Sequence, residues 1–324
     1  MKFQKRILAS LVLASAVFFV SCEENSVIDP NPTGATPMAP TGVQVSTRSE
    51  TSIAVRWTKA TGDTVVATGY EVIAQAGATA TPITKTTTVA AASGYVFTGL
   101  TEGVVYDFTV KALSGTRTSA ASAKVSWAPA KRTTMSARMY VSSSSLGSGL
   151  NLATGQSLTI ADGDKWDICL DDKNNNLLVG SPGVSGYVNN SFQFPNGKDA
   201  KIVRIRNVTK RATSLNDIWE TSSLGDGSST STFKEQLFDL ATIAASDGGL
   251  GFVVATFTIP TIANYAKVLV KSDSANFVKG TGSGRYIEVE VSYQSAANTP
   301  YALTKLMNVG GERTTSNTIR TAKD

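Results

Sequence analysis

The sequence predicts a mostly β protein in which a β-sandwich is followed by a β-rich domain with one short helix. Short segments rich in Val, Ile, Tyr, Thr and Trp recur along the chain, separated by Gly, Ser and Thr. In one of them, residues 52–57 alternate so that Ile53, Val55 and Trp57 share a face, as in a strand with one buried side. Only residues 231–245 have the apolar spacing of a helix, so the expected helix content is low.

Residues 1–21 have the features of a secretory signal. Basic residues near the start precede an apolar stretch at residues 7–20, which is too short for a comfortable membrane span. Cys22 follows directly, and the stretch FVSC resembles the lipobox of bacterial lipoproteins, in which the cysteine thiol takes a diacylglycerol. The resemblance implies lipidation at Cys22 and stable anchoring by several acyl chains. The alternative is a plain secreted protein with an unrelated cysteine.

Residues 22–39 are expected to be a lipidated, flexible tether. Four prolines occur in residues 25–40, with little that could form a core, which favours an extended spacer. Glu23 and Glu24 follow the cysteine, and this acidic pair resembles the surface-export signal of Bacteroidota lipoproteins. The resemblance implies a lipid anchor in the outer membrane with exposure at the cell surface; a periplasmic orientation is the alternative.

Composition excludes several classes of function. The 30 basic residues fall to 27 once the signal is removed, against 25 acidic residues, so a nucleic-acid partner is not expected. The chain has no histidine, which excludes Ser-His-Asp and Cys-His catalysis and histidine-ligated zinc or haem. Once Cys22 is lipidated, Cys169 has no cysteine left to pair with. We therefore expect no catalytic residue and no cofactor.

Residues 40–130 resemble a fibronectin type III domain. Trp57 occupies the position of that family's strand-B tryptophan. The stretch LTEGVVYDFTVKAL, residues 100–113, resembles the corner between the family's strands E and F, where the hydroxyl of Tyr106 would bond a backbone group upstream. The resemblance implies a β-sandwich that serves as a spacer or a binding module.

Residues 131–308 are expected to form the β-rich domain, and residues 309–324 a polar tail. The helix is predicted in STFKEQLFDLATIAA, residues 231–245, after a Ser- and Thr-rich lead that can cap it. Three segments resemble parts of the HmuY-like haem-binding lipoproteins, whose two histidine ligands this chain lacks. These segments are KWDICLDD, VGSPGVSG and GRYIEVEVSYQ. The candidate strands are SARMYVS, QSLTIAD, KWDICLDD, NLLVGSP, AKIVRIRNV, LGFVVATFTI, YAKVLVKS, GRYIEVEVSYQ and YALTKLM.

Two groups of residues are candidates for ligand binding. Trp219 lies in a polar, Gly- and Ser-rich stretch, where an indole could stack on a sugar or pack under a loop. Arg204 and Arg206 share a strand face that could meet an anionic polysaccharide or a lipid headgroup. A solvated strand face is the alternative for the arginines.

Two further groups have the spacing of a chemical site but also an ordinary structural explanation. Asp172, Asn174 and Asn176 have the one-three-five spacing of a calcium loop, yet the glycine and glutamate of an EF-hand are missing, and a polar turn has the same composition. Glu288 and Glu290 share a strand face about 6–7 Å apart. Glycosidases use such a separation, but an exposed strand face also has it.

These features predict a non-catalytic envelope or cell-surface lipoprotein. The fibronectin-like domain would be a spacer that presents the β-rich domain for adhesion or assembly, with a protein or a polysaccharide as partner. The alternative is a carbohydrate-binding surface lipoprotein. A glycoside hydrolase and a HmuY-like binding protein without histidine ligation are more distant alternatives.

Overall fold

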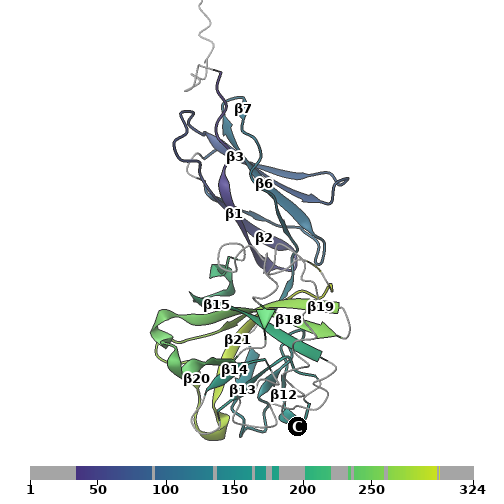
Figure 1. Ribbon diagram of the computed structural model, residues 1–324, viewed down its shortest axis with the longest axis vertical. Coiled ribbons are helices and arrows are strands. Elements are labelled where there is room, and N and C mark those ends of the chain that lie inside the picture. Colours follow the sequence, from purple (N-terminus) through teal and green to yellow (C-terminus); the bar gives the residue numbers. More distant parts are fainter. Residues whose placement is uncertain are drawn as a thin grey trace, which may run out of the picture.

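The computed structural model describes residues 34–299 except 90–91, 134–136, 163–164, 173–176, 182–200, 220–232, 235–236, 259–261 and 298. Figure 1 shows two β domains in line, which we call the N-terminal sandwich (residues 41–130) and the C-terminal β domain (residues 131–297). The fold is mostly β, as predicted. Within the described ranges, no helix has the length and apolar character needed to span a membrane.

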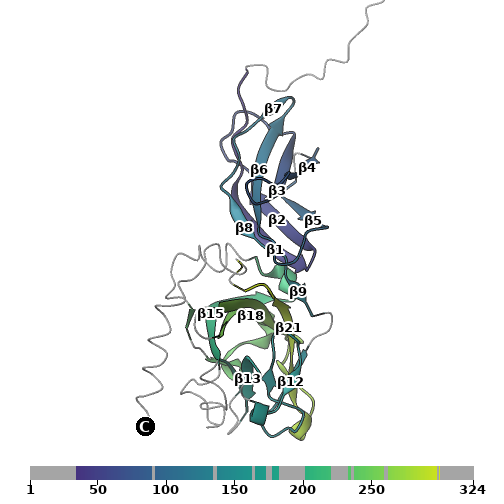
Figure 2. The same ribbon diagram turned by 90° about the vertical axis from the view of Figure 1, so that its right-hand side faces the viewer.

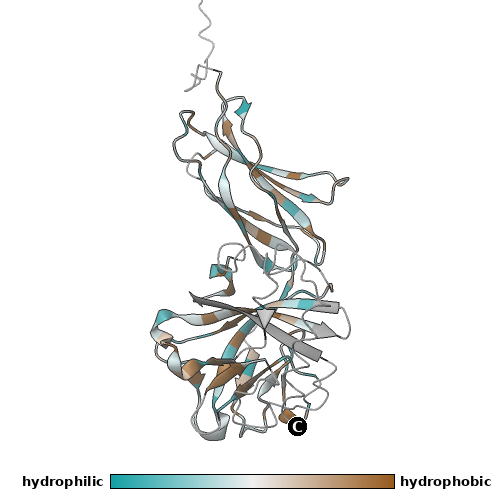
Figure 3. Cartoon of the chain, viewed as in Figure 1, coloured by the Kyte–Doolittle hydropathy of each residue, from teal (hydrophilic) through white to brown (hydrophobic). Residues whose placement is uncertain are grey.

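The N-terminal sandwich consists of two antiparallel sheets. One has the order β1-β2-β5 and the other β4-β3-β6-β7, with β8 also paired to β6. Apolar and polar residues alternate along these strands (Figure 3), because successive side chains point to opposite faces. The strands are β1 (Thr41–Ser49), β2 (Ser52–Thr58), β3 (Gly69–Ala76), β4 (Ile83–Thr87), β5 (Gly94–Phe97), β6 (Tyr106–Ser114), β7 (Arg117–Thr118) and β8 (Val125–Trp127).

Aromatic side chains fill the space between the two sheets. Trp57 is 4% exposed, and its ring centroid lies 5.2 Å from that of Tyr70. The backbone N–H of Thr101 donates to the hydroxyl of Tyr106 at 3.1 Å, which confirms the predicted corner. A hydroxyl bonded in this way lets the tyrosine ring enter the core without leaving a polar atom unsatisfied.

The C-terminal β domain also has two sheets. In Figure 2 the sheet that contains β15, β18 and β21 curves over the sheet that contains β12 and β13. The first has the order β10-β21-β19-β18-β15-β16, with β9 and β20 on β21, and the second β12-β11-β13-β14-β17. Buried residues between them include Met139, Leu170, Phe252, Val268 and Val289.

The strands and 3₁₀ turns of this domain are short in the smaller sheet and long in the larger one. They are β9 (Lys131–Arg132), β10 (Ala137–Tyr140), β11 (Gly149–Leu150), β12 (Ser157–Leu158), η1 (Ile160–Asp162), β13 (Ile168–Asp171), β14 (Leu178–Gly180), β15 (Lys201–Ala212), η4 (Leu215–Asp217), β16 (Phe233–Lys234), β17 (Leu237–Asp239), η6 (Leu240–Thr242), η7 (Ala245–Asp247), β18 (Gly249–Thr258), β19 (Ile262–Val270), β20 (Val278–Lys279), η8 (Gly282–Gly284) and β21 (Tyr286–Tyr293).

The helix predicted at residues 231–245 is wrong. β17 adds to the edge of the smaller sheet by pairing with β14, and a single 3₁₀ turn follows it. The carboxylate of Asp239 accepts the backbone N–H of Ala241 at 3.0 Å, and this bond caps the turn. Phe238 and Leu240 are both buried in the domain core. Of the residues whose spacing suggested a helical face, Leu240 therefore reaches the core from a turn, whereas Ala241 is exposed.

Several predicted segments lie outside the described residues. They are the signal and Cys22, the tether up to residue 33, the strand YALTKLM at residues 301–307 and the polar tail.

Candidate functional site

The junction between the two domains is the candidate site, because it is where buried polar and aromatic residues from both domains meet. β19 lies between two apolar clusters. Ala266 and Val268 belong to the core of the C-terminal β domain, whereas Tyr265 belongs to the cluster that contains Trp127 of the sandwich. Val253 and Ala255 of the neighbouring β18 belong to this sandwich cluster too. The apolar core of the sandwich therefore continues into the C-terminal β domain.

The segment around η4 crosses the junction and contacts β1. Ser214 caps η4, and its hydroxyl accepts the backbone N–H of Asn216 at 3.1 Å. The hydroxyl of Ser46 donates to the backbone carbonyl of Ile218 at 3.1 Å. Nη1 of Arg48 donates to the backbone carbonyl of Asn216 at 2.9 Å. These bonds fix the η4 segment against the outer face of the sandwich.

A fully buried lysine joins the same contact. Lys267 on β19 is 0% exposed, and its ammonium donates to the Ser46 hydroxyl and to the Ile218 carbonyl, both at 3.4 Å. Burying an ammonium is costly unless hydrogen bonds compensate for the lost water. Oxygen atoms from both sides of the junction therefore surround this charge.

Trp219 lies directly after that segment. The guanidinium carbons of Arg48 and Arg56 lie 5.1 Å and 4.2 Å from its ring centroid. Nε of Arg56 donates to Oε1 of Gln44 at 2.6 Å, and burial lowers the pKa of Arg56. The indole is thus engaged in cation–π contacts between the domains. A sugar could stack on the ring face under these guanidiniums only by displacing them.

Glu290 lies beside the η4 segment, within the C-terminal β domain. Its carboxylate pairs with Nη2 of Arg132 at 2.8 Å and with Nζ of Lys271 at 3.2 Å, while Nη1 of Arg132 donates to Oδ1 of Asn216 at 2.8 Å. Burial opposes ionisation of Glu290, but the hydrogen bonds from Arg132 and Lys271 outweigh it and lower the pKa of the carboxyl. Glu288 shares this strand face, as predicted, and pairs with Lys279 at 2.7 Å.

Acid is expected to weaken, through Glu290, the contacts that hold the η4 segment in the C-terminal β domain. Because the pKa of Glu290 is lowered in the folded chain, its stabilisation is present above the unfolded value of about 4.3 and is lost as the pH falls through the folded value. Unfolding in denaturant, followed from neutral pH down through this range, should therefore show less acid destabilisation in Glu290→Gln than in the wild type. Thr58→Ala, which changes an exposed, uncharged side chain at the end of β2, should keep the wild-type dependence. Equal acid sensitivity in all three proteins would contradict this role of Glu290.

The remaining predicted site residues lie elsewhere. Arg204 and Arg206 are on β15, in register with Ala255 and Val253 of β18. Asn174 and Asn176 lie outside the described residues. The carboxylate of Asp172 accepts the backbone N–H and the hydroxyl of Ser142, at 2.9 Å and 2.7 Å, and pairs with Arg285 at 2.5 Å. In the part of the chain that is described, no three His, Cys, Asp or Glu residues are grouped to hold a metal ion.

Sequence reasoning missed the polar residues of the junction. Ser46 and Arg48 alternate with buried residues of β1, so their pattern is that of a solvated face. Lys267 carried a signal, because it is a single charge within the apolar run YAKVLV. An ionisable residue inside such a run indicates either a break in the strand or a buried, bonded charge.

The two sheets and the tyrosine corner define the N-terminal sandwich as an immunoglobulin-like β-sandwich. More specifically, residues 38–128 match the family model of the fibronectin type III domain, and this segment is such a domain. The match covers one part of the chain and leaves the C-terminal β domain unassigned. No curated protein matches the sequence.

Several solved structures are similar to this part of the chain. The FN5 domain of Drosophila Lar has 24% identity, with 29% of this chain and 97% of that chain covered and a TM-score of 0.25. An Fn3-like protein from Clostridium thermocellum has 25% identity, with 28% and 92% covered and a TM-score of 0.25. The fn3 domain of human collagen alpha-1(XX) has 17% identity, with 31% and 90% covered and a TM-score of 0.26.

Proposed function

We propose that the chain is a non-catalytic lipoprotein of the bacterial outer membrane, anchored at the cell surface through acyl chains on Cys22. In this proposal the fibronectin type III domain is a rigid stalk. The C-terminal β domain is held away from the membrane and contacts a protein or polysaccharide partner in adhesion or assembly.

The observation that carries this proposal is the continuous core across the junction. Tyr265, Val253 and Ala255 of the C-terminal β domain pack in the same cluster as Trp127 of the sandwich. The buried hydrogen bonds of Lys267 fix the two parts further. A stalk that is packed against its terminal domain transmits position and force, whereas a flexible linker between them would not.

The path of the chain also supports this arrangement. Arg117 of β7 donates to the carbonyl of Ala35 at 2.9 Å, which ties the start of the described chain to the end of the sandwich remote from the junction (Figure 1). An anchor that precedes residue 34 would therefore lie at the opposite end of the stalk from the C-terminal β domain.

Replacing Cys22 by alanine is expected to release the protein from the membrane fraction, because the acyl chains would supply the anchoring free energy. The intact mass of the wild type should include these chains, and protease added to whole cells should remove the C-terminal β domain. Cys169→Ala, which changes a buried thiol, should leave the protein in the membrane fraction. An unmodified Cys22 in the mature chain, or full protection from the protease, would overturn the proposal.

A further inference from the structure

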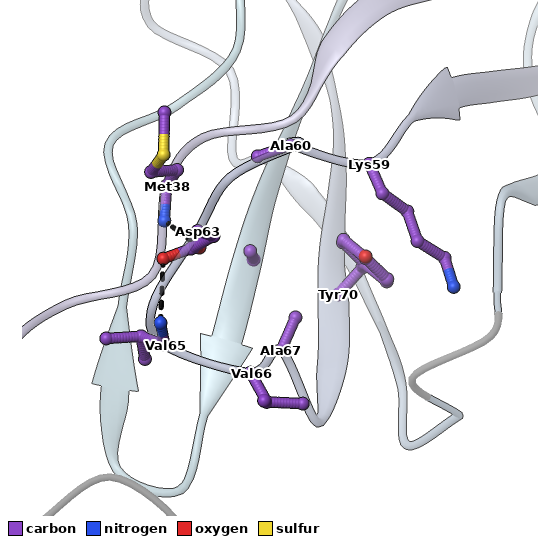
Figure 4. A pocket seen from close by; sticks show the side chains of 9 residues that line it. Met38, Lys59, Ala60, Asp63, Val65, Val66, Ala67 and Tyr70 are labelled. Carbon is purple, nitrogen blue, oxygen red and sulfur yellow. Dashed lines mark hydrogen bonds between the residues drawn. The ribbon is translucent and has the colours of Figure 1, made fainter.

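A pocket of about 400 Å³ opens at the end of the N-terminal sandwich remote from the junction. It lies between the segment that precedes β1 and the loop that joins β2 to β3 (Figure 4). The volume is in the range of small-molecule sites, and such sites combine apolar walls with a few polar groups. The apolar lining consists of Met38, Ala60, Val65, Val66, Ala67 and Ala112.

Asp63 holds two walls of the pocket together. One oxygen of its carboxylate accepts the backbone N–H of Met38 at 2.6 Å, and the other accepts that of Val65 at 2.9 Å. Figure 4 shows both bonds, with Asp63 and Lys59 on opposite sides of the pocket. Both oxygens of the Asp63 carboxylate therefore accept bonds from the wall, which is formed before any ligand arrives. Burial, and then the charge of Asp63, raise the pKa of Tyr70, so its hydroxyl remains a donor.

The hydroxyl of Tyr70 is the polar group that points to a ligand. Tyr70 is 2% exposed, and its ring packs against Trp57. Figure 4 shows the hydroxyl among the side chains that line the pocket. Among the residues that the structure describes, none forms a hydrogen bond with it. A buried phenol normally has a partner, so this donor is available to an acceptor in the pocket.

Lys59 supplies a charge at the same site. Its side chain is exposed at the pocket, and no carboxylate of the described ranges pairs with its ammonium. Lys59 and Tyr70 therefore both line this apolar cavity, and each carries a donor, one of them cationic. Charge complementarity favours a ligand with an anionic acceptor at one end and an apolar body at the other.

We propose that this pocket binds a small apolar carboxylate. The hydrocarbon part of the ligand lies against Val65 and Ala67, and its carboxylate lies between the Tyr70 hydroxyl and the Lys59 ammonium. This site is separate from the junction and from the lipid anchor, so it does not depend on the proposed stalk function.

Octanoate, with octan-1-ol as its neutral counterpart, is a suitable probe on the full mature chain. Methyl NMR resonances of Met38, Val65 and Ala67 should shift in a saturable way, with a dissociation constant of about 1 mM for octanoate. Lys59→Met should weaken octanoate binding about tenfold, because it removes a charge-assisted bond, and should leave octanol binding unchanged.

Two further variants make the test specific. Tyr70→Phe keeps the ring against Trp57 and removes only the hydroxyl, so octanoate should bind about threefold to tenfold more weakly to a fully folded protein. Lys85→Met changes an exposed lysine on β4 of the same domain and should change nothing. Shifts scattered over other methyl groups, or equal affinity for octanoate and octanol, would overturn the proposal. Equal binding by wild type and Lys59→Met would do so too.

Discussion

Trp57→Ala is expected to lower the free energy of unfolding of the full mature chain by about 3–5 kcal/mol. The indole is 4% exposed and packs 5.2 Å from the ring of Tyr70, in the middle of the sandwich core. Alanine would leave a cavity that the two sheets cannot close, because hydrogen bonds to β1 and β5 hold β2 in place on both sides. Equilibrium denaturation followed by circular dichroism measures the loss.

Thr58→Ala is the matched control for this change. Thr58 is the exposed last residue of the same strand, so its replacement should alter stability by no more than about 0.5 kcal/mol. If Trp57→Ala were as mild as the control, the indole would not be part of the core. The assignment of the strand to the family's strand B would then fail.

The sandwich could be predicted largely from the sequence because the patterns that specify its strands lie within short segments of the chain. The alternation in β2 and β6 places Trp57 and Tyr106 in the core, and both are buried. β4 carries no such signal, because ITKTT has no apolar alternation and lies at the edge of its sheet. An edge strand with one partly buried side needs little apolar surface, so periodicity cannot detect it.

The junction could not be predicted in the same way. Ser46 of β1 has the alternation of an outward-facing residue, yet it is 0% exposed because the carbonyl of Ile218 lies against it. The two residues are 172 positions apart, and no local pattern links them. Trp219 was expected in an open, polar stretch for the same reason. Its arginine partners come from strands of the other domain.

The composition of the run LGFVVATFTI does indicate that one strand is covered on both faces. A strand with one buried face alternates, whereas this run is apolar at almost every position, as in strands covered on both faces. β18 has both faces buried, with Phe252 and Val254 toward the domain core and Val253 and Ala255 toward the sandwich. A continuous apolar strand within an otherwise alternating domain therefore indicates that a second layer covers it.

Tyr265→Ala is expected to uncouple the two domains and to cost about 3–5 kcal/mol of stability. Tyr265 is 1% exposed and belongs to the cluster that continues from the sandwich into β19. Because that cluster joins the domains, the wild type should unfold in one cooperative calorimetric transition. Loss of the tyrosine ring would leave each domain with its own core and a weak contact between them. The transition should then split in two.

Val268→Ala on the same strand distinguishes uncoupling from simple destabilisation. Val268 faces the core of the C-terminal β domain, on the opposite side of β19 from Tyr265. Its truncation should lower the melting temperature while the transition stays single, since the contact with the sandwich remains. If the wild type already showed two transitions, or if Tyr265→Ala kept one, the shared core would not couple the domains. The rigid stalk proposed for this chain would then lose its physical basis.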